Sequence, residues 1–151
     1  MDSRHPRSVA AIAGHPIHPM LVPFPIAFFT LALVMDVAYW QSANLNWKHF
    51  AEWLLFAGLV AGALAAVVGA VDFFSRREIR SLTPAWPHAI GNVIVMILAF
   101  FNSLVHARDG WTGVVPIGLA LSVATVLLLL VTGWLGGAMV YRHGVGVKDV
   151  D

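Results

Sequence analysis

Four long, almost uninterrupted apolar stretches dominate the sequence, and short polar segments separate them. The stretches cover approximately residues 21–40, 51–74, 85–106 and 114–141. Each is long enough to cross the roughly 30 Å hydrocarbon core of a bilayer, which takes about 20 helical residues. Backbone groups in lipid need hydrogen-bond partners within their own segment, so each stretch is predicted to be a helix. The pattern therefore predicts an all-α, polytopic membrane protein with four transmembrane helices in a bundle.

Composition supports a bilayer as the solvent of this chain. The 151 residues are 59% hydrophobic and 11% charged, whereas a soluble domain has roughly 25% charged residues. No amphipathic helix is present that would cover so apolar a core in water. The net charge of +1 gives no basis for binding nucleic acid, so the expected partner is lipid. The absence of cysteine excludes disulfides, thiolate metal sites and Cys-ligated iron–sulfur clusters.

The distribution of Lys and Arg predicts the orientation in the membrane. Of the nine cationic residues, Lys48 and Arg108 fall at one end of the bundle. The end that carries both termini holds the rest: Arg4, Arg7, Arg76, Arg77, Arg80, Arg142 and Lys148. Cationic residues are enriched in cytoplasmic segments, so both termini are predicted to be cytoplasmic. This divides the chain into an N-terminal segment 1–20, a transmembrane domain 21–141 and a C-terminal tail 142–151, and no cleavable signal peptide is evident.

Prolines and small residues predict where the helices bend and pack. Pro16, Pro19, Pro23 and Pro25 lie within ten residues. Since proline is tolerated only in the first turn of a helix, residues 14–22 are predicted to be an extended or kinked entry to a helix that is regular from about Pro23. In lipid, small residues allow helices to approach closely. Two stripes are predicted contact faces: Gly58, Gly62, Ala65 and Gly69 on the second span, and Gly133-x-x-x-Gly137 on the fourth.

Ionisable residues gather at the helix ends near the termini, where each of the four spans contributes one or more. They are His15, His18, Asp72, His88 and His143. On the third span, at about 100° per residue, a polar stripe within about 40° of one line is predicted to face the bundle interior. Its members are His88, Asn92, Asn102 and His106. A second, looser group is expected at the opposite end: Asp36, His49, Glu52 and His106.

Three interpretations of the cluster near the termini remain open. Imidazole is a ligand for haem iron, zinc and copper, and a carboxylate such as Asp72 can orient a ligating histidine. Neighbouring His and Asp could instead relay protons, because histidine titrates near neutral pH. In the third interpretation, these groups cap helix ends and tie down loops, with no cofactor. His5 and His49 are expected to be solvated loop residues.

Two long motifs resemble a known family. Gly-His-Pro-Ile-His-Pro-Met-Leu-Val at 14–22 is followed by Phe24-Pro25, and residues 133–147 read Gly-Trp-Leu-Gly-Gly-Ala-Met-Val-Tyr-Arg-His-Gly-Val-Gly-Val. Both resemble the bacterial membrane family called domain of unknown function 2231. The resemblance covers about residues 13–147 and includes Asp36, Asp72 and His88. One departure concerns Pro23, where many members carry a histidine, so that position provides no ligand here.

The family has no established activity, but the resemblance implies a cellular location and a class of function. It places the chain in the bacterial cytoplasmic membrane. Similar membrane domains occur fused to Rieske-type or cytochrome c-type modules, which implies electron transfer and haem. This chain has no such module, so its electron partner would be a separate redox protein.

The resulting hypothesis is a haem- or metal-binding membrane subunit in electron transfer that is not an enzyme on its own and is compatible with a homo-oligomer. The expected cofactor is haem b, with zinc or copper as alternatives. Candidate ligands are His15, His18, His88 and His143, and the preferred pair is His88 and His143. Asp72 and Asn92 are expected to orient these ligands. A second candidate site at the opposite end consists of Asp36, Glu52 and His106. A non-catalytic protein with a structural polar cluster and a proton or metal-ion transporter are the alternative functions. No Ser-His-Asp pattern, phosphate loop or nucleophile elbow is legible.

Overall fold

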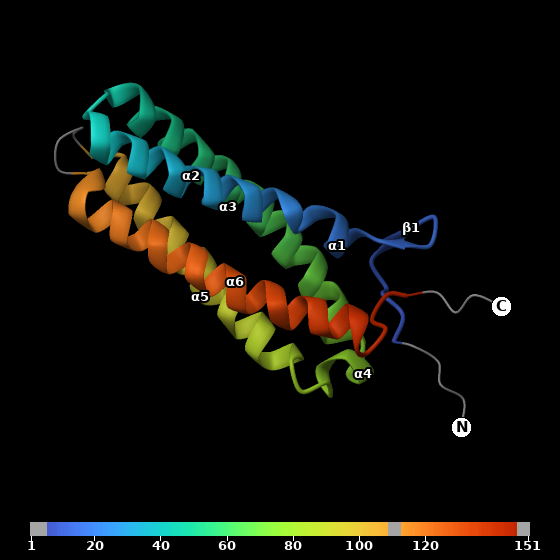
Figure 1. The fold of residues 1–151 in the computed structure, drawn as a ribbon. Helices are drawn as coiled ribbons and strands as arrows, with labels where there is room; N and C mark the ends of the chain where they lie inside the picture. The colour runs from blue at the N-terminus through green and yellow to red at the C-terminus, as the bar shows by residue number, and fades with distance from the viewer. Residues whose placement is uncertain (1–5, 109–112, 148–151) are drawn as a thin grey trace.

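Each of the four apolar stretches forms a long helix in the computed structural model, which describes residues 6–108 and 113–147. The four helices run side by side as an elongated bundle (Figure 1). The elements in chain order are β1 Ala11–Ile12, β2 His15–Pro16, α1 Ile17–Leu21, α2 Pro23–Ser42, α3 Leu45–Ser75, α4 Arg77–Arg80, α5 Ala85–His106, the π-helical turn η1 Val114–Gly118, and α6 Leu119–Tyr141. Four candidate membrane spans result, at 17–42, 45–75, 85–106 and 114–141, which confirms the predicted fold class.

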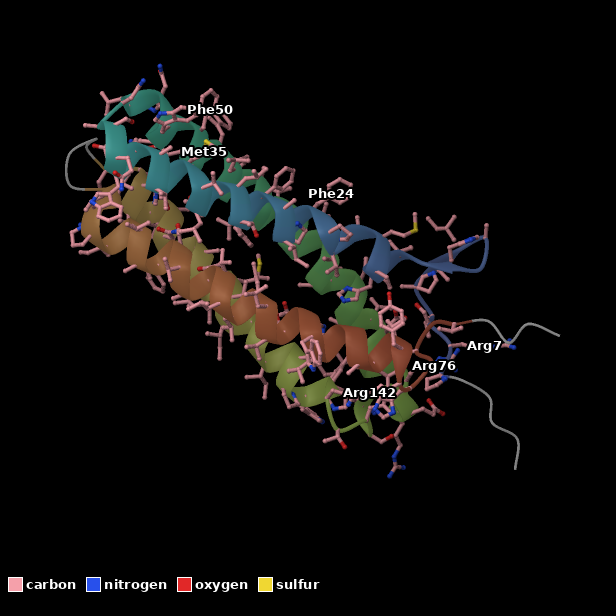
Figure 2. All side chains as sticks on the ribbon, in the orientation of Figure 1. Arg7, Phe24, Met35, Phe50, Arg76 and Arg142 are labelled. Atoms are coloured by element: carbon pink, nitrogen blue, oxygen red, sulfur yellow. The ribbon has the colours of Figure 1, made fainter. Side chains whose placement is uncertain are left out.

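The two ends of the bundle differ in what they carry. Both termini and α4 lie at one end, here called the terminal end, and the α2–α3 and α5–α6 connections lie at the other, the connection end (Figure 1). Helix α2 packs mainly along α3 and α5 along α6, and the two pairs meet through α3 with α5 and α2 with α6. Arg7, Arg76 and Arg142 project at the terminal end, whereas Phe24 and Phe50 lie on the outside of the bundle (Figure 2). Those exposed aromatic rings are where lipid tails are expected.

The non-helical entry to the first span is shorter than the segment 14–22 that the prolines predicted. Residues 11–16 form a small hairpin, whose turn uses Ala13 and Gly14 at φ 50° and 80°. Helix α1 already begins at Ile17, and only Val22, whose own φ of −55° and ψ of −35° are helical, lies between it and α2. The regular helix does start at Pro23, as predicted. The prolines inside these two helices fall in their first turns, where the missing amide is not needed.

Helix α3 begins six residues before the predicted start of its span because a side chain caps it. The Oδ1 atom of Asn44 accepts a hydrogen bond from the backbone N of Asn46 at 3.0 Å. A cap of this kind satisfies an amide that a helix leaves unpaired in its first turn. The additional residues bring Lys48 into the helix, so α3 extends beyond the apolar stretch at the connection end.

The middle of the bundle is a tightly packed apolar core. It consists of Phe29 and Ala32 from α2, Leu55 from α3, Val95 and Ala99 from α5, and Leu129 from α6. The predicted glycine stripe on α3 is confirmed as a contact face. A Cβ at Gly58 would overlap the Phe29 ring, and one at Gly62 would lie 2.6 Å from the sulfur of Met96. These two glycines therefore permit the close approach of α3 to its neighbours.

The second predicted glycine contact, Gly133-x-x-x-Gly137, is wrong within this chain. A Cβ at Gly133 would meet nothing within 4 Å, and one at Gly137 would meet only Tyr141 of its own helix. Both glycines line an open groove of about 520 Å³ on the surface of the bundle. The close approach of α6 to α5 uses Gly91 and Gly136 instead, which lie against Thr132 and His88. The rotation of α6 about its axis therefore differs from the one its glycine motif indicated.

Candidate functional site

His18 and His88 meet near the terminal end of the bundle, from two different helices. His18 lies in α1 and His88 in the first turn of α5, and both are half-buried. Their ring centroids are 6.3 Å apart and their planes are perpendicular. Each ring packs against a glycine of a third or fourth helix, His18 against Gly69 of α3 and His88 against Gly136 of α6. Each of the four membrane spans therefore contributes a residue to this histidine pair or to its packing.

The backbone fixes the orientation of both rings. His18 Nδ1 lies 2.8 Å from the carbonyl oxygen of Ala65, and His88 Nδ1 lies 2.9 Å from that of Thr132. A carbonyl oxygen only accepts hydrogen bonds, so Nδ1 carries the proton in each ring. In the neutral imidazole, Nε2 then bears a lone pair. A histidine held through Nδ1–H to a carbonyl is the usual arrangement of a metal ligand that binds through Nε2.

Asn92 accompanies His88 on the next turn of α5, as the polar stripe predicted. Its Nδ2 donates to the backbone oxygen of His88 at 2.8 Å and lies 3.4 Å from Nε2 of the same ring. The longer separation is too great for a strong hydrogen bond. The lone pair of His88 Nε2 is therefore not committed to the amide.

The separation of the two ring centres lies within the range that two histidine ligands of one metal ion can span. A metal–nitrogen bond of about 2.0–2.1 Å, added to about 1.1 Å from Nε2 to the ring centre, puts two opposed ring centres at most about 6.4 Å apart. The observed separation is 6.3 Å. In the described part of the chain, no set of three or more His, Cys, Asp or Glu side chains forms a metal-binding group. Zinc sites use three or four protein ligands, so two histidines alone do not make a zinc site.

The other two candidate histidines are not part of this pair. His15 is exposed in β2, with Nδ1 3.2 Å from the oxygen of Ala13. His143 is exposed in the turn that follows α6. The ring beside His88 is that of His18, so the structure does not bring together the preferred pair His88 and His143.

Asp72 holds the N-terminal segment in place. Its Oδ2 accepts from the Ser8 hydroxyl at 2.5 Å, and its Oδ1 accepts from the amides of Val9 and Ala10 at 2.6 and 2.9 Å. The buried carboxylate therefore ties the chain before β1 to the end of α3. This corresponds to the structural interpretation of the cluster, in which polar groups tie down loops. No pattern in the sequence distinguished Ser8 as the partner of Asp72.

A second polar centre lies toward the connection end and is more deeply buried. Asp36, Asn102 and His106 are 0% exposed and Ser122 is 2% exposed. His106 Nε2 lies 2.8 Å from Asp36 Oδ1, and the Ser122 hydroxyl donates to Asp36 Oδ2 at 2.5 Å. Asn102 Nδ2 donates to Ser122 Oγ at 2.8 Å, and His106 Nδ1 lies 3.0 Å from the backbone oxygen of Asn102. We refer to these four residues as the Asp36 network.

The candidate site predicted at this end is thus divided in two. Asp36 and His106 belong to the Asp36 network, whereas Glu52 forms ion pairs with Lys48 and His49 at the start of α3. His49 is 60% exposed, as expected of a solvated residue. His5 lies outside the described residues. Ser122 was not predicted, although its spacing from Thr125 and Thr132 places it on the hydroxyl-bearing face of α6 that turns inward.

The apolar core separates the two polar centres along every helix. On α5, Val95 and Ala99 lie between His88 and His106, and on α6, Leu129 lies between Thr132 and Ser122. The histidine pair and the Asp36 network are therefore two distinct sites rather than one polar channel.

Comparison with known proteins identifies one related group. A family model described as "Predicted membrane protein (DUF2231)" matches residues 14–149, which includes both long sequence motifs. No curated protein and no solved structure matches the chain.

Proposed function

The chain belongs to the DUF2231 family of predicted membrane proteins, and we propose that within this family it is an electron-transfer subunit that binds haem iron or copper between His18 and His88. The observation that carries the proposal is the pair of rings 6.3 Å apart, each with Nδ1 directed at a backbone carbonyl. Such a centre would supply one-electron redox chemistry at the terminal end of the bundle. We further propose the bacterial cytoplasmic membrane as its location, with this end facing the cytoplasm.

The chain's own residues would bind and orient this centre. The carbonyl oxygens of Ala65 and Thr132 hold the Nδ1 protons, which leaves the lone pair of each Nε2 for a metal ion and would increase the basicity of the ligands. Both rings are half-buried, and partial burial would restrict water around a bound metal and influence its redox potential. Exposed Arg7, Arg76 and Arg142 at the same end (Figure 2) would attract an acidic surface on a separate redox protein.

The first alternative is a structural role for the histidine pair. Histidines that donate Nδ1–H to carbonyls of other helices would also hold helices together without a metal. The second alternative, transport of protons or metal ions, is less well supported, because the apolar core lies between the two polar centres. The experiment below separates the first alternative from the proposal.

The test is the visible absorption spectrum of protein purified in mild detergent, before and after reduction with dithionite, together with elemental analysis. Bound haem should give a low-spin b-type spectrum that sharpens on reduction, and bound copper should be stoichiometric without a Soret band. His18→Ala and His88→Ala should each abolish or convert the signal. The matched controls His15→Ala and His143→Ala, at exposed histidines, should retain it. Protein that carries neither haem nor copper, and gains neither on reconstitution, would rule out the proposal.

A further inference from the structure

The hydrogen bonds of the Asp36 network form a closed ring that starts and ends on one residue. The amide of Asn102 donates to Ser122, and Ser122 donates to Asp36. Asp36 is joined to His106, and His106 donates through Nδ1 to the backbone oxygen of Asn102. In all but one of these bonds, the chemistry of the acceptor shows which atom carries the proton. The exception is the bond between Asp36 Oδ1 and His106 Nε2. That bond holds one proton, which either atom can carry.

A single proton makes the network neutral overall. With the proton on Asp36 the pair is a carboxylic acid and a neutral imidazole, and with the proton on His106 it is a carboxylate and an imidazolium. Both forms have no net charge, which is the condition that burial at 0% exposure in a membrane span favours. An ionisable pair at this depth is by default a functional site.

One acceptor in the network is left over. Among the described residues, Asn102 Oδ1 is the buried side-chain atom without a hydrogen-bond partner. Rotation of the amide by half a turn exchanges its oxygen and nitrogen, and would present Oδ1 to Ser122 Oγ in place of Nδ2. The network therefore contains an unused acceptor next to a hydroxyl that now donates elsewhere.

We propose that Asp36 and His106 form a proton-binding site that takes up a second proton, and that this uptake reverses the hydrogen bonds from Asp36 to Asn102. A hydronium ion transfers its proton to the pair and leaves as water. His106 Nε2–H then donates to Asp36 Oδ1, and the new O–H on Asp36 Oδ2 donates to Ser122 Oγ. The Ser122 hydroxyl turns to Asn102 Oδ1, which supplies the acceptor that the one-proton state leaves without a partner.

The connection end is the end of the bundle nearer to the pair. His106 is the last residue of α5, and Asp36 lies six residues before the end of α2, which corresponds to about 9 Å of helix. The backbone over His106 is irregular, because η1 contains a non-helical residue at Val115 and Gly118 lies against the ring. Irregular backbone at membrane depth is tolerated where protein or water surrounds it. On the other side, the apolar core closes the site.

Few titratable side chains lie on the elements that pack around Asp36 and His106. Helix α2 contributes Tyr39, and α3 contributes Lys48, His49 and Glu52, which pair with one another at the connection end. Lys48 also donates to the backbone oxygen of Arg108 at 3.2 Å. Helix α6 contributes only hydroxyl groups, those of Ser122 and Thr125, to this region. Since Lys48 is neutralised by Glu52, Asp36 and His106 are the groups whose protonation changes the charge of the site.

The experiment follows both partners while the pH is lowered from about 9 to about 4, a range that brackets histidine and carboxylate titration. Infrared spectroscopy of the protein in mild detergent reports the C=O band of protonated Asp36, and nitrogen NMR of ¹⁵N-histidine protein reports His106. After uptake of the second proton, Asp36 is a carboxylic acid and His106 is an imidazolium. The protein at low pH should therefore show both the C=O band and the imidazolium signals, and whichever is missing at high pH should appear in a single transition. Asp36→Asn should remove the band and the His106 transition together.

A second variant keeps the test decisive if Asp36→Asn does not fold. Ser122→Ala removes the hydroxyl through which the bonds reverse, and should therefore change the pH at which the transition occurs. Glu52→Gln, at the same end but outside the network, should leave the midpoint unchanged. The proposal is overturned if folded protein shows no transition, if the protein at low pH lacks either the carboxyl band or the His106 imidazolium signals, or if Ser122→Ala has no effect. Neither measurement depends on metal or haem, so this result is independent of the function proposed above.

Discussion

The imidazole of His18 packs directly on Gly69. A Cβ built at Gly69 would lie 2.9 Å from both Cε1 and Nδ1 of the ring, and a Cβ at Gly136 would lie 2.9 Å from Cε1 of His88. Any side chain at either glycine would therefore force its ring to move, because interiors packed at this density have no space to absorb it. The positions of the two histidines depend on two glycines that are 67 residues apart in the chain (136 minus 69).

Gly69→Ala and Gly136→Ala should each displace one ring of the histidine pair. Overpacking of this kind typically costs about 1–3 kcal/mol, which SDS-induced unfolding in mixed micelles would measure. The displaced ring should also weaken any metal or haem signal. Gly137→Ala is the matched control, since its Cβ would make only an ordinary contact at 3.9 Å with Tyr141. Equal stability of all three variants would contradict the packing described here.

The two glycine motifs should respond oppositely to a large side chain. Gly62→Leu should lower the thermal stability in detergent, because α3 there lies against Met96 and Pro25. Gly133→Leu should have little effect, since its position opens into the surface groove. Leu64→Ala, at a side chain that is 56% exposed, should also be mild. If Gly133→Leu proves the more damaging variant, the groove is filled by another helix in the native protein.

Asp72→Ala should release the segment that precedes β1. The substitution removes the acceptor of three hydrogen bonds, from Ser8, Val9 and Ala10. Bonds to a charged group contribute about 1.5–3 kcal/mol each, so the segment should open much more often. Trypsin should then cleave after Arg7 several-fold faster than in the wild type. Glu78→Ala, which removes an exposed carboxylate at the same end, should leave the cleavage rate unchanged.

The orientation predicted from the Lys and Arg distribution can be tested with single cysteines, because the chain has no native cysteine. Ser42 and Ser81 are exposed at opposite ends of the bundle. Ser42→Cys should react with a membrane-impermeant maleimide added to intact cells, and Ser81→Cys should react only after the cells are opened. The reverse labelling pattern would place the terminal end, with the histidine pair, outside the cytoplasm.

The sequence by itself determined the features that depend on one segment at a time. The four spans follow from stretch length and hydropathy, and the inward face of α5 follows from the period of His88, Asn92, Asn102 and His106. The glycine stripe of α3 was also legible, since one face of one helix carries it. The start of α3 was missed because the Asn44 cap allows the helix to continue past its apolar stretch into water.

Only the tertiary structure decided which residues meet. His88 lies beside His18 rather than His143, Asp72 binds Ser8, and Ser122 joins Asp36 from a position 86 residues away. Each of these pairings depends on the depth and the axial rotation of one helix relative to another. In lipid, close packing between helices sets both quantities. The rotation of α6 is set by Gly91 and Gly136 rather than by Gly133 and Gly137. The periodicity of one helix shows which of its faces carry small residues, but it does not show which of those faces a neighbouring helix will contact.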